Sequence, residues 1–501
     1  MATNKSQQSP KVKAGSFSLS NDVNLLSYAT SGEGLETLNV RQLVSALTIY
    51  ESFDIKFLSG DIQLTDNQGV IEGLPLTGHE LIEFVLHTPG AEEMPYDFSR
   101  ATGHPMHVYK ISDISQLNQT TKTYKLHFCS TELIKNYTEV VDTAKKGTID
   151  KIVVDIIKNN LKTKKDIFVE PTIGNRKYVF PRMKPLQAIT MLAKESESKK
   201  FANTGYRFYE TRYGLNFRSL ESLFSNSDKT PKKAKAGFYD APKGKQGDFA
   251  KNYQKVFSMM ITSRFDTLHN LRNGVYASKM VNIDGLTKTF SESNYSFQED
   301  FNKLTHVGLS DSQTGKPKGN KFSFLPAYNY NEGKTLSGFP EANVYFNSSS
   351  TSGFTEKGDD SYKVKNPYDR VPVEKLLQRQ KGQQYAFEQN IIEISVPGNI
   401  SLCLGDVVGF STIIQLTDGG VKRLVNDPFL TGNYLISSIA HVMSVVDGAM
   451  RTNLTLMKDC ISAPYPTETK NRKEGSRKER IIDVYSVESK EDNFSIRSWF
   501  S

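Results

Sequence analysis

The sequence contains no apolar run that approaches the roughly 18 residues needed to cross a membrane as a helix. Its first residues, Met1 to Ser6, show no apolar core behind a basic stretch, so the sequence predicts no secretory signal. From these two absences we expect synthesis in the cytoplasm and no membrane partner.

Cysteine and tryptophan are scarce, with three cysteines and one tryptophan among 501 residues. Cys129, Cys403 and Cys460 lie inside strand-like runs and show no Cys-x-x-Cys or Cys/His spacing. We therefore expect buried, reduced thiols rather than a redox or zinc site. The net charge of +8 is modest for this length and indicates ordinary solubilising charge rather than a polyanion-binding surface.

Complete motifs for catalysis and cofactor binding are also lacking. A phosphate-binding Walker loop fails because Tyr328 stands where its first glycine belongs, ahead of Gly333-Lys334-Thr335. The zincin pattern fails because His79-Glu80-Leu81-Ile82 is followed by Glu83. His104-Pro105-Met106-His107 offers two imidazoles but no third ligand nearby in sequence, which favours a surface or packing role. The sequence therefore predicts no catalytic residue, no cofactor and no metal site.

Aromatic and cationic side chains are interleaved from Tyr206 to Tyr213. Such a pattern suits stacking on nucleic-acid bases or sugars, and it equally suits an amphipathic pair of strands. Because no complete recognition-module signature surrounds it, we predict the strand pair.

What the sequence does contain is β-structure, most clearly in the segment 391–460. Residues Ile391 to Val396 alternate apolar and polar side chains, and Ile400 to Leu404 and Val407 to Phe410 are predicted as the next two strands. Turn residues separate these runs. Five of them are predicted to fix the strand register of this small barrel: Gly398, Gly405, Asp406, Gly432 and Asn433.

Three strings in this segment, VPGNISLCLGDVVGF, LTGNYLISSIAH and RTNLTLMKD, resemble the C-terminal barrel of baseplate hub proteins of contractile-tailed bacteriophages of the T-even type. Residues 261–290 resemble the segment that precedes this barrel in similar virion proteins. The resemblance implies two similar tail-tube-like barrels per chain. It also matches His441 to a position often held by histidine, although a lone strand histidine is usually a packing residue.

The fold class predicted from these patterns is multidomain α+β, with two small antiparallel β-barrels framing a mixed α/β insertion and extended termini. Helical spacing predicts helices that begin near Thr131, Thr148, Pro185 and Val373. The expected domains are a flexible arm (1–37), a first barrel (38–130), an insertion (131–390) with a β segment (253–300) and a long loop (303–370), a second barrel (391–462), and a C-terminal extension (463–501).

The resemblance implies a structural virion protein without enzymatic activity, located in the tail baseplate and made in the host cytoplasm. As a homotrimeric hub with a pseudo-six-fold ring, it would join the hexameric tail tube to the trimeric spike. The implied partners are tail-tube initiator or tube proteins, a central spike or cell-puncturing protein, and baseplate wedge proteins, with DNA only passing through the channel. Tyr485 and Trp499 are candidate partner anchors in the C-terminal extension. The alternative is an enzyme or nucleic-acid-binding protein with a site in the insertion, within 131–300.

Overall fold

The computed structural model describes most of the chain outside its two ends. The described residues are 15–28, 35–74, 76–89, 95–201, 204–226, 238–240, 254–263, 266–284, 289–301, 303–307, 335–348, 373–418, 421–427 and 429–461.

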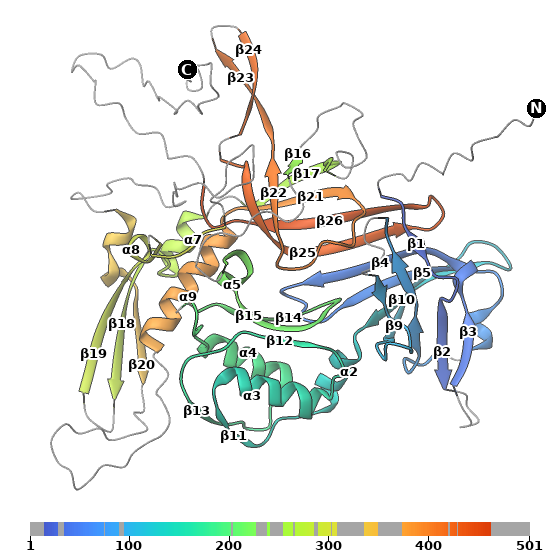
Figure 1. Ribbon diagram of the computed structural model, residues 1–501, viewed down its shortest axis with the longest axis horizontal. Coiled ribbons are helices and arrows are strands. Elements are labelled where there is room, and N and C mark those ends of the chain that lie inside the picture. The colour runs from blue at the N-terminus through green and yellow to red at the C-terminus, as the bar shows by residue number, and fades with distance from the viewer. Residues whose placement is uncertain are drawn as a thin grey trace, which may run out of the picture.

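A 13-stranded sheet is the largest of the described sheets and crosses the upper part of Figure 1. Its strands pair in the following order: β17 (Ser258–Ser263), β21 (Ile391–Pro397), β26 (Ala449–Met457), β25 (Gly432–Ser444), β4 (Val44–Ser52), β5 (Ser59–Asp66), β10 (Lys122–Cys129), β9 (Met106–Gln116), β6 (Leu81–Glu83), β2 (Asn24–Tyr28) and β3 (Leu35–Asn39). Off this path, β22 (Val407–Ser411) pairs with β25 and with the short β16 (Phe238–Asp240).

The N-terminal and C-terminal β regions meet where β4 pairs with β25. The pairing is antiparallel and runs from Ser52 opposite Ser438 to Ala46 opposite Ser444. Each region keeps its own apolar core, one centred on β5, β9 and β10 and the other on β21, β25 and β26. We call these regions the first and second lobes. Because both lobes share one sheet, the described strands do not confirm the prediction of two closed barrels.

The flexible arm predicted over residues 1–37 is wrong for its described second half. Strand β1 (Ser18–Leu19) pairs with β7 (Val85–His87), which also pairs with β8 (Tyr96–Asp97), and β2 and β3 extend the main sheet. The segment is poor in apolar residues, but Val23, Leu25 and Leu26 are fully buried. Few apolar side chains are enough here, because Val23 and Leu25 join a core whose other residues come from distant strands.

Between β5 and β6 the chain forms one helical turn, α1 (Val70–Gly73), which follows Gly69 at a φ of 72°. A left-handed residue redirects the chain at this point, and glycine adopts that conformation without steric cost.

The insertion lies below the sheet in Figure 1. It combines helices with a two-stranded and a three-stranded sheet around its own core. Its elements are α2 (Thr131–Thr138), β11 (Ala144–Gly147), α3 (Ile149–Ile156), η2 (Ile157–Leu161), β12 (Ile167–Val169), β13 (Arg176–Val179), α4 (Pro185–Glu195), β14 (Tyr206–Thr211), β15 (Gly214–Ser219) and α5 (Leu220–Phe224). The helices predicted from residue spacing are confirmed, as is the strand pair predicted at Tyr206.

A three-stranded sheet lies at the left of Figure 1, next to the long helix α9 (Val373–Glu388). Strand β18 (Ala277–Asp284) lies between β19 (Thr289–Ser296) and β20 (Val344–Ser348). On α9, Gln378 donates to Ser278 O at 3.2 Å and Arg379 pairs with Asp300 at 2.9 Å, so polar contacts fix the helix against this sheet.

The remaining described elements are short: α7 (Thr267–Arg272), α8 (Phe297–Phe301), η3 (Leu336–Gly338), η4 (Pro340–Ala342) and the hairpin of β23 (Ile413–Asp418) with β24 (Val421–Asn426). The long loop predicted over 303–370 contains β20, and most of it lies outside the described residues.

Candidate functional site

The joint between the two lobes contains a buried carboxylate. Glu51 lies in β4 opposite Ile439 of β25 and is 1% exposed. The Tyr96 hydroxyl donates to Glu51 Oε1 at 2.6 Å, and the Leu404 N–H donates to Oε2 at 3.3 Å. The Glu51 side chain therefore connects β4 of the first lobe to the 398–406 loop of the second.

Arg212, at the end of β14 in the insertion, reaches the same place. Its guanidinium donates to the carbonyl oxygens of Ile400 and Ser401, the latter at 3.3 Å, and to the Tyr213 hydroxyl at 2.7 Å. It also lies 5.8 Å from the centre of the Tyr96 ring, within reach of a cation–π interaction. The first lobe, the second lobe and the insertion thus meet in one polar cluster, which we call the joint cluster.

Burial shifts the pKa values in the joint cluster. Burial raises the pKa of Glu51 to about 7, although the hydrogen bonds from Tyr96 and Leu404 and the charge of Arg212 act in the opposite direction. Burial, aided by the charge of Arg212, lowers the pKa of His441 to about 3. His441 is fully buried, packs edge-on against Tyr96 and has its Nδ1 atom 3.0 Å from Thr452 Oγ1, so it is a neutral packing residue.

The strand predicted at Ile400 to Leu404 is wrong, and the joint cluster explains why. The segment forms turns rather than a strand. The amide of Cys403 donates to the Asp406 carboxylate at 2.8 Å, as that of Leu404 does to Glu51. Side chains thus supply the acceptors that a neighbouring strand would otherwise provide. An apolar run alone could not reveal this, because Glu51 and Arg212 are distant in sequence.

The predicted turn residues occupy both ends of this region. Gly405 has a φ of 85°, and the N–H of Asp406 donates to Cys403 O at 3.1 Å. Gly398 donates to Met450 O at 2.9 Å, in a place where a side chain would collide with that of Met450.

Gly432 and Asn433 begin β25 opposite Phe410 and Gly409. Gly432 has a φ of 146°. The buried side-chain amide of Asn433 has no hydrogen-bond partner in the described part of the chain. The candidate anchors Tyr485 and Trp499 lie outside the described residues.

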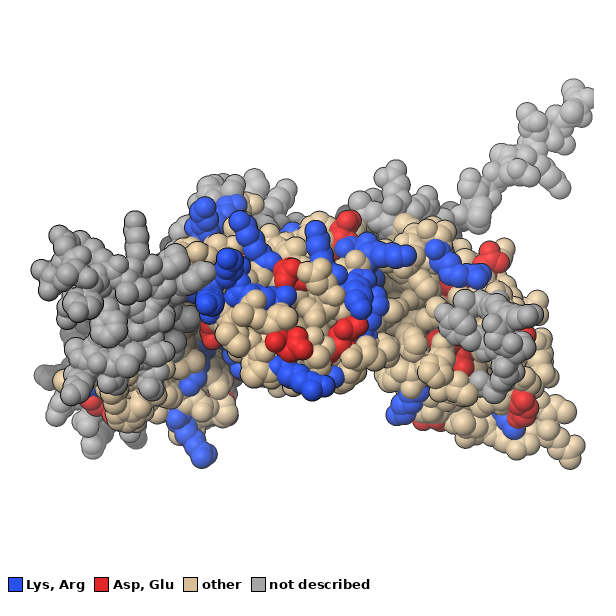
Figure 2. Space-filling model, turned by 90° about the horizontal axis from the view of Figure 1, so that it is seen from below, with Lys and Arg blue, Asp and Glu red and all other residues tan. Residues whose placement is uncertain are grey.

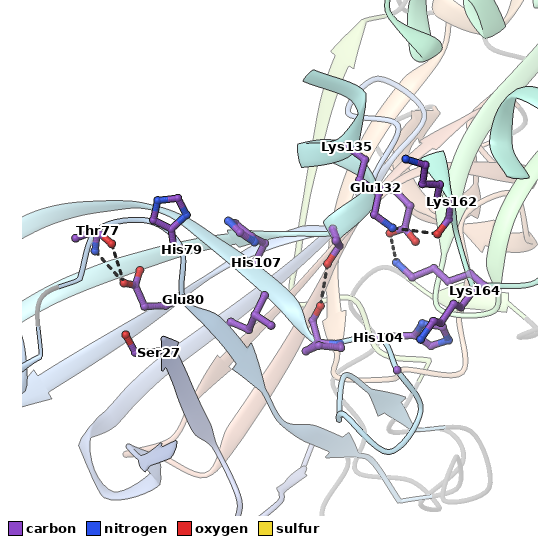
Figure 3. A pocket seen from close by; sticks show the side chains of 15 residues that line it. Ser27, Thr77, His79, Glu80, His104, His107, Glu132, Lys135, Lys162 and Lys164 are labelled. Atoms are coloured by element: carbon purple, nitrogen blue, oxygen red, sulfur yellow. Dashed lines mark hydrogen bonds and ion pairs between the residues drawn. The ribbon is translucent and has the colours of Figure 1, made fainter. Parts of the chain in front are cut away.

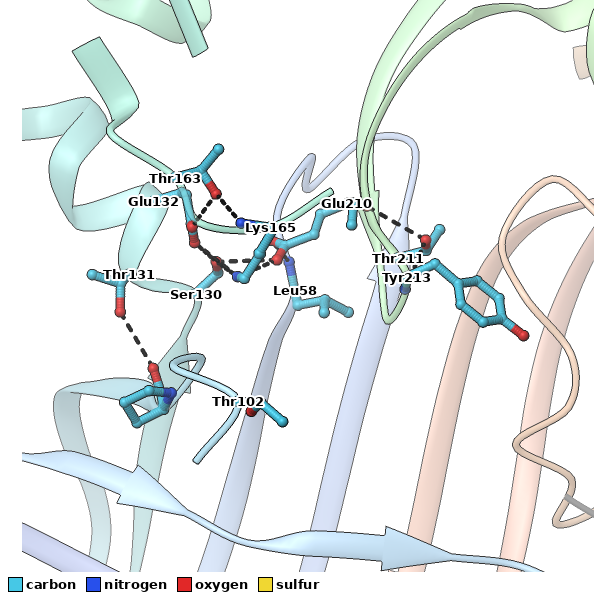
Figure 4. A network of polar contacts seen from close by, with 12 residues as sticks. Leu58, Thr102, Ser130, Thr131, Glu132, Thr163, Lys165, Glu210, Thr211 and Tyr213 are labelled. Atoms are coloured by element: carbon cyan, nitrogen blue, oxygen red, sulfur yellow. Dashed lines mark hydrogen bonds and ion pairs between the residues drawn. The ribbon is translucent and has the colours of Figure 1, made fainter. Parts of the chain in front are cut away.

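A second buried polar cluster joins the insertion to the first lobe (Figure 4). The Lys165 ammonium lies 2.8 Å from Glu132 and 2.5 Å from Glu210, and it donates to Ser130 Oγ at 2.7 Å. Glu210 in turn accepts from the Leu58 N–H at 3.0 Å. We call these residues the Lys165 cluster.

The two carboxylates of the Lys165 cluster titrate differently. Burial raises the pKa of Glu210, despite the attraction of Lys165. For Glu132, burial is outweighed by the charge of Lys165 and by hydrogen bonds from Lys165, Ser130 and Thr163, which hold its pKa at about 2. The ion cluster therefore depends on one ammonium group shared between two acids.

Two motifs that were rejected as separate metal sites lie together in space. His79 and Glu80 line the same hollow as His104 and His107, between the edge of the first lobe and helix α2 (Figure 3). Glu80 accepts from the amides of Thr77 and Gly78 at 2.9 and 2.8 Å, which gives it a structural role. His107 Nε2 is 3.0 Å from Gly78 O. This convergence could not be predicted from the two motifs, because it arises only when the first lobe folds both to one edge.

His306, Asp459 and Cys460 form a buried group whose ligand atoms lie within 4.8 Å of one another. Both ring nitrogens of His306 already have partners, since Nδ1 is 2.8 Å from Asp459 and Nε2 is 2.8 Å from Phe301 O. The remaining Asp459 oxygen accepts from the Val307 N–H at 3.0 Å. This geometry fits a structural tie between segments better than a metal site.

The chain is similar to a class of phage tail proteins, the baseplate hub proteins. The probable baseplate hub protein gp334 of Vibrio phage KVP40 is 23% identical over 378 residues, which cover 74% of this chain and 80% of that protein. This match confirms the resemblance seen in the sequence and indicates a structural protein of the virion tail. No family model matches the chain.

Two solved tail proteins also align with most of the chain. The tail protein from Neisseria meningitidis MC58 is 12% identical and covers 87% of this chain and 97% of its own, with a TM-score of 0.45. The 43 kDa tail protein of prophage MuSo2 from Shewanella oneidensis is 12% identical and covers 88% and 98%, with a TM-score of 0.45. None of the helices in the described part of the chain is long and apolar enough to span a bilayer.

The raised pKa of Glu51 predicts a pH-dependent stability that Glu51→Gln removes. Because the folded pKa of about 7 exceeds the ordinary value of 4.5, the folded protein favours the protonated carboxyl and loses stability as pH rises between these values. Over that window we expect the wild type to lose on the order of 3 kcal/mol relative to Glu51→Gln. Urea unfolding of both proteins at a series of pH values measures the difference. A difference that does not change with pH would show that folding leaves the pKa of Glu51 at its ordinary value.

The Lys165 cluster predicts a large cost for Lys165→Met. The substitution leaves Glu132 and Glu210 buried without their cation, and we expect a loss of about 3–5 kcal/mol in the free energy of unfolding. The triple variant Lys165→Met/Glu132→Gln/Glu210→Gln should regain part of this loss, because it also removes the charges. Lys164→Met, at the exposed neighbouring residue, is the control for thermal unfolding. Equal stability of the Lys165 and Lys164 variants would contradict the assignment.

Proposed function

We propose that this chain is the subunit of a baseplate hub, in which three copies close into a ring that joins the hexameric tail tube to the trimeric spike. The observation that carries the proposal is the continuous sheet in which one chain presents two β lobes side by side, joined by β4 and β25. Three such chains contribute six lobes, which matches a six-fold partner on one side and a three-fold partner on the other.

The ends of the sheet support ring closure. Strand β17 ends the sheet path on one side and β3 on the other, and neither has a further strand partner among the described residues. Met259, Met260 and Ile261 of β17 are 37%, 57% and 40% exposed. An exposed apolar edge strand invites pairing with another chain. Because the two edges differ, contact between copies is head-to-tail, the arrangement that generates rings.

The sheet face opposite the two cores suits a channel through which DNA passes. Most cross-strand neighbours on this face are small or polar across both lobes, as in the row Asn453, Ala440, Tyr50 and Ser59, and the exposed Val442 opposite Thr48 is an apolar exception. Further members are Thr48, Asp61, Gln63, Lys125, His127, Ser438, Ser444 and Thr455. Such a surface offers hydrogen bonds to water without a dense positive charge that would hold the DNA backbone.

The proposed domains are the first lobe (38–130, to which the described part of 15–37 adds strands), the insertion (131–390), the second lobe (391–462) and a C-terminal extension (463–501). We propose tube or tube-initiator proteins, a spike or cell-puncturing protein and wedge proteins as neighbours, with Tyr485 and Trp499 as anchors for them. Gly398, Gly405, Asp406, Gly432 and Asn433 are proposed to hold the register of the second lobe.

The proposed role is structural rather than enzymatic. The alternative places an enzymatic or nucleic-acid site in 131–300. Of the aromatic side chains that suggested it, Tyr206, Phe208 and Tyr209 are each 2% exposed and belong to cores. Tyr213 is 42% exposed, and its hydroxyl accepts from Arg212 at 2.7 Å. In the described part of that segment, the Lys165 cluster directs its charges at one another.

Assembly predicts different effects for two substitutions of Met259. The N–H of Gly398 donates to Met450 O of β26 at 2.9 Å, so by the alternation of a strand Ile394 of β21 also faces β26. Met259 lies opposite Ile394, and its N–H therefore points to the open edge. Met259→Pro removes this outward donor while sparing the bonds to β21, and edge strands tolerate proline. We expect wild type and Met259→Ala to form trimers by mass photometry, whereas Met259→Pro shifts toward monomer. A wild type that stays monomeric at high concentration would rule out the ring.

A further inference from the structure

We infer that the hollow between the first lobe and the insertion binds an acidic polypeptide segment of a neighbouring tail protein. The inference rests on the proposed function, since it assigns one partner contact of the hub. It concerns a surface away from the joint cluster, beside the β2–β3 end of the sheet.

The hollow has a volume of about 730 Å³ and two walls of different origin. One wall comes from β2, β6 and the residues before β9, with Ser27, Thr77 and Leu81 among them, and the other from helix α2 and the 162–165 loop (Figure 3). A space of this size accommodates part of an extended peptide. Figure 2, which views the molecule from the side of the insertion, shows lysine and arginine gathered around its central part.

The negative groups in these walls are two carboxylates that are hydrogen-bonded within the walls. Glu80 is 1% exposed, and its carboxylate accepts from the backbone amides of Thr77 and Gly78. Glu132 accepts from Lys165 at 2.8 Å and from Thr163 at 2.7 Å. The four lysines that line the hollow outnumber these two carboxylates, so the lining carries an excess of positive charge.

The lysines of the hollow differ in their partners. Lys164 is exposed and has no hydrogen-bond or ion-pair partner among the described residues. The Lys135 ammonium donates to Lys162 O at 3.0 Å, a carbonyl rather than a carboxylate. Lys162 is paired with Glu139 at 2.9 Å. Burial and then the charge of Lys165 lower the pKa of His104, against the smaller opposite effects of Glu132 and Asp97.

The arrangement favours a chain of acidic residues over a single small anion. In Figure 3, Lys164 lies beside His104, Lys135 and Lys162 lie on the α2 side, and His79 and His107 lie toward the other end. A phosphate ion is held best by donors that converge on one point. Here the lysines lie along one wall, on α2 and the 162–165 loop, and the opposite wall supplies Leu81 and two histidines. This arrangement suits an extended chain whose carboxylates face the lysine wall.

The test is fluorescence anisotropy of the full-length protein with a dye-labelled peptide of alternating glutamate and glycine, at an ionic strength of about 0.05 M, where screening is weak. Lys135→Gln/Lys164→Gln should weaken binding about tenfold, since each lysine would pair with an exposed carboxylate. The matched control is Lys146→Gln/Lys177→Gln, which removes the same charge from the exposed β11–β13 pair of the insertion. Lys164→Gln alone, at an exposed residue without partners, guards against loss of folding in the double variant.

Binding that weakens in the hollow variants and not in the control supports the inference. It is overturned if the wild type does not bind the peptide, if the control weakens binding equally, or if tripolyphosphate binds as tightly as the peptide and competes with it. Mass photometry of the same samples separates the two proposals. If the protein forms a trimer and does not bind the peptide, only the acidic-peptide site is refuted. If it stays monomeric and binds the peptide, only the ring is refuted.

Discussion

The pairing of β4 with β25 is the contact on which the rest of the molecule depends. It joins residues that are almost 400 positions apart in sequence, as Ser52 with Ser438 shows, and so converts two β regions into one sheet. Contacts of such sequence separation carry a large ordering cost, which the cores on both sides must offset. We infer that neither lobe reaches its final form until this pairing exists, because each leaves β4 or β25 as an open edge without it.

The insertion stabilises this joint from below through a single strand. On β14, the Glu210 N–H donates to Lys56 O at 2.9 Å, and its side chain accepts from Leu58 in the first lobe. Two residues later, Arg212 binds the carbonyls of the 398–406 loop in the second lobe. Buried charges of this kind are costly unless each is paired and hydrogen-bonded. Their value here is positional, since a different register of β4 on β25 would leave Glu51 without Tyr96 and Leu404.

The sequence predicted the local elements of the fold better than their partners. A period-2 run identified β21, and helical spacing identified α4, which begins at a proline. It missed β2, because its few apolar residues matter only beside strands from elsewhere, and it predicted a strand at Ile400 because the acceptors of that loop come from Glu51 and Asp406. Of the candidate site, the turn glycines were visible in sequence, whereas the joint cluster and the hollow depend on contacts between distant segments.

The same dependence links the proposed assembly to the hollow. The Lys165 cluster fixes the 162–165 loop against Ser130 and Glu132, and those residues continue directly from β10 of the first lobe. The wall that carries Lys135 and Lys164 therefore cannot move independently of the sheet whose edges are proposed to form the ring. Because the loop and the sheet are one mechanical unit, a partner held in the hollow would take a fixed position relative to the ring axis. A hub that must present each neighbour at a defined angle needs this kind of rigid coupling between its sheet and its peripheral sites.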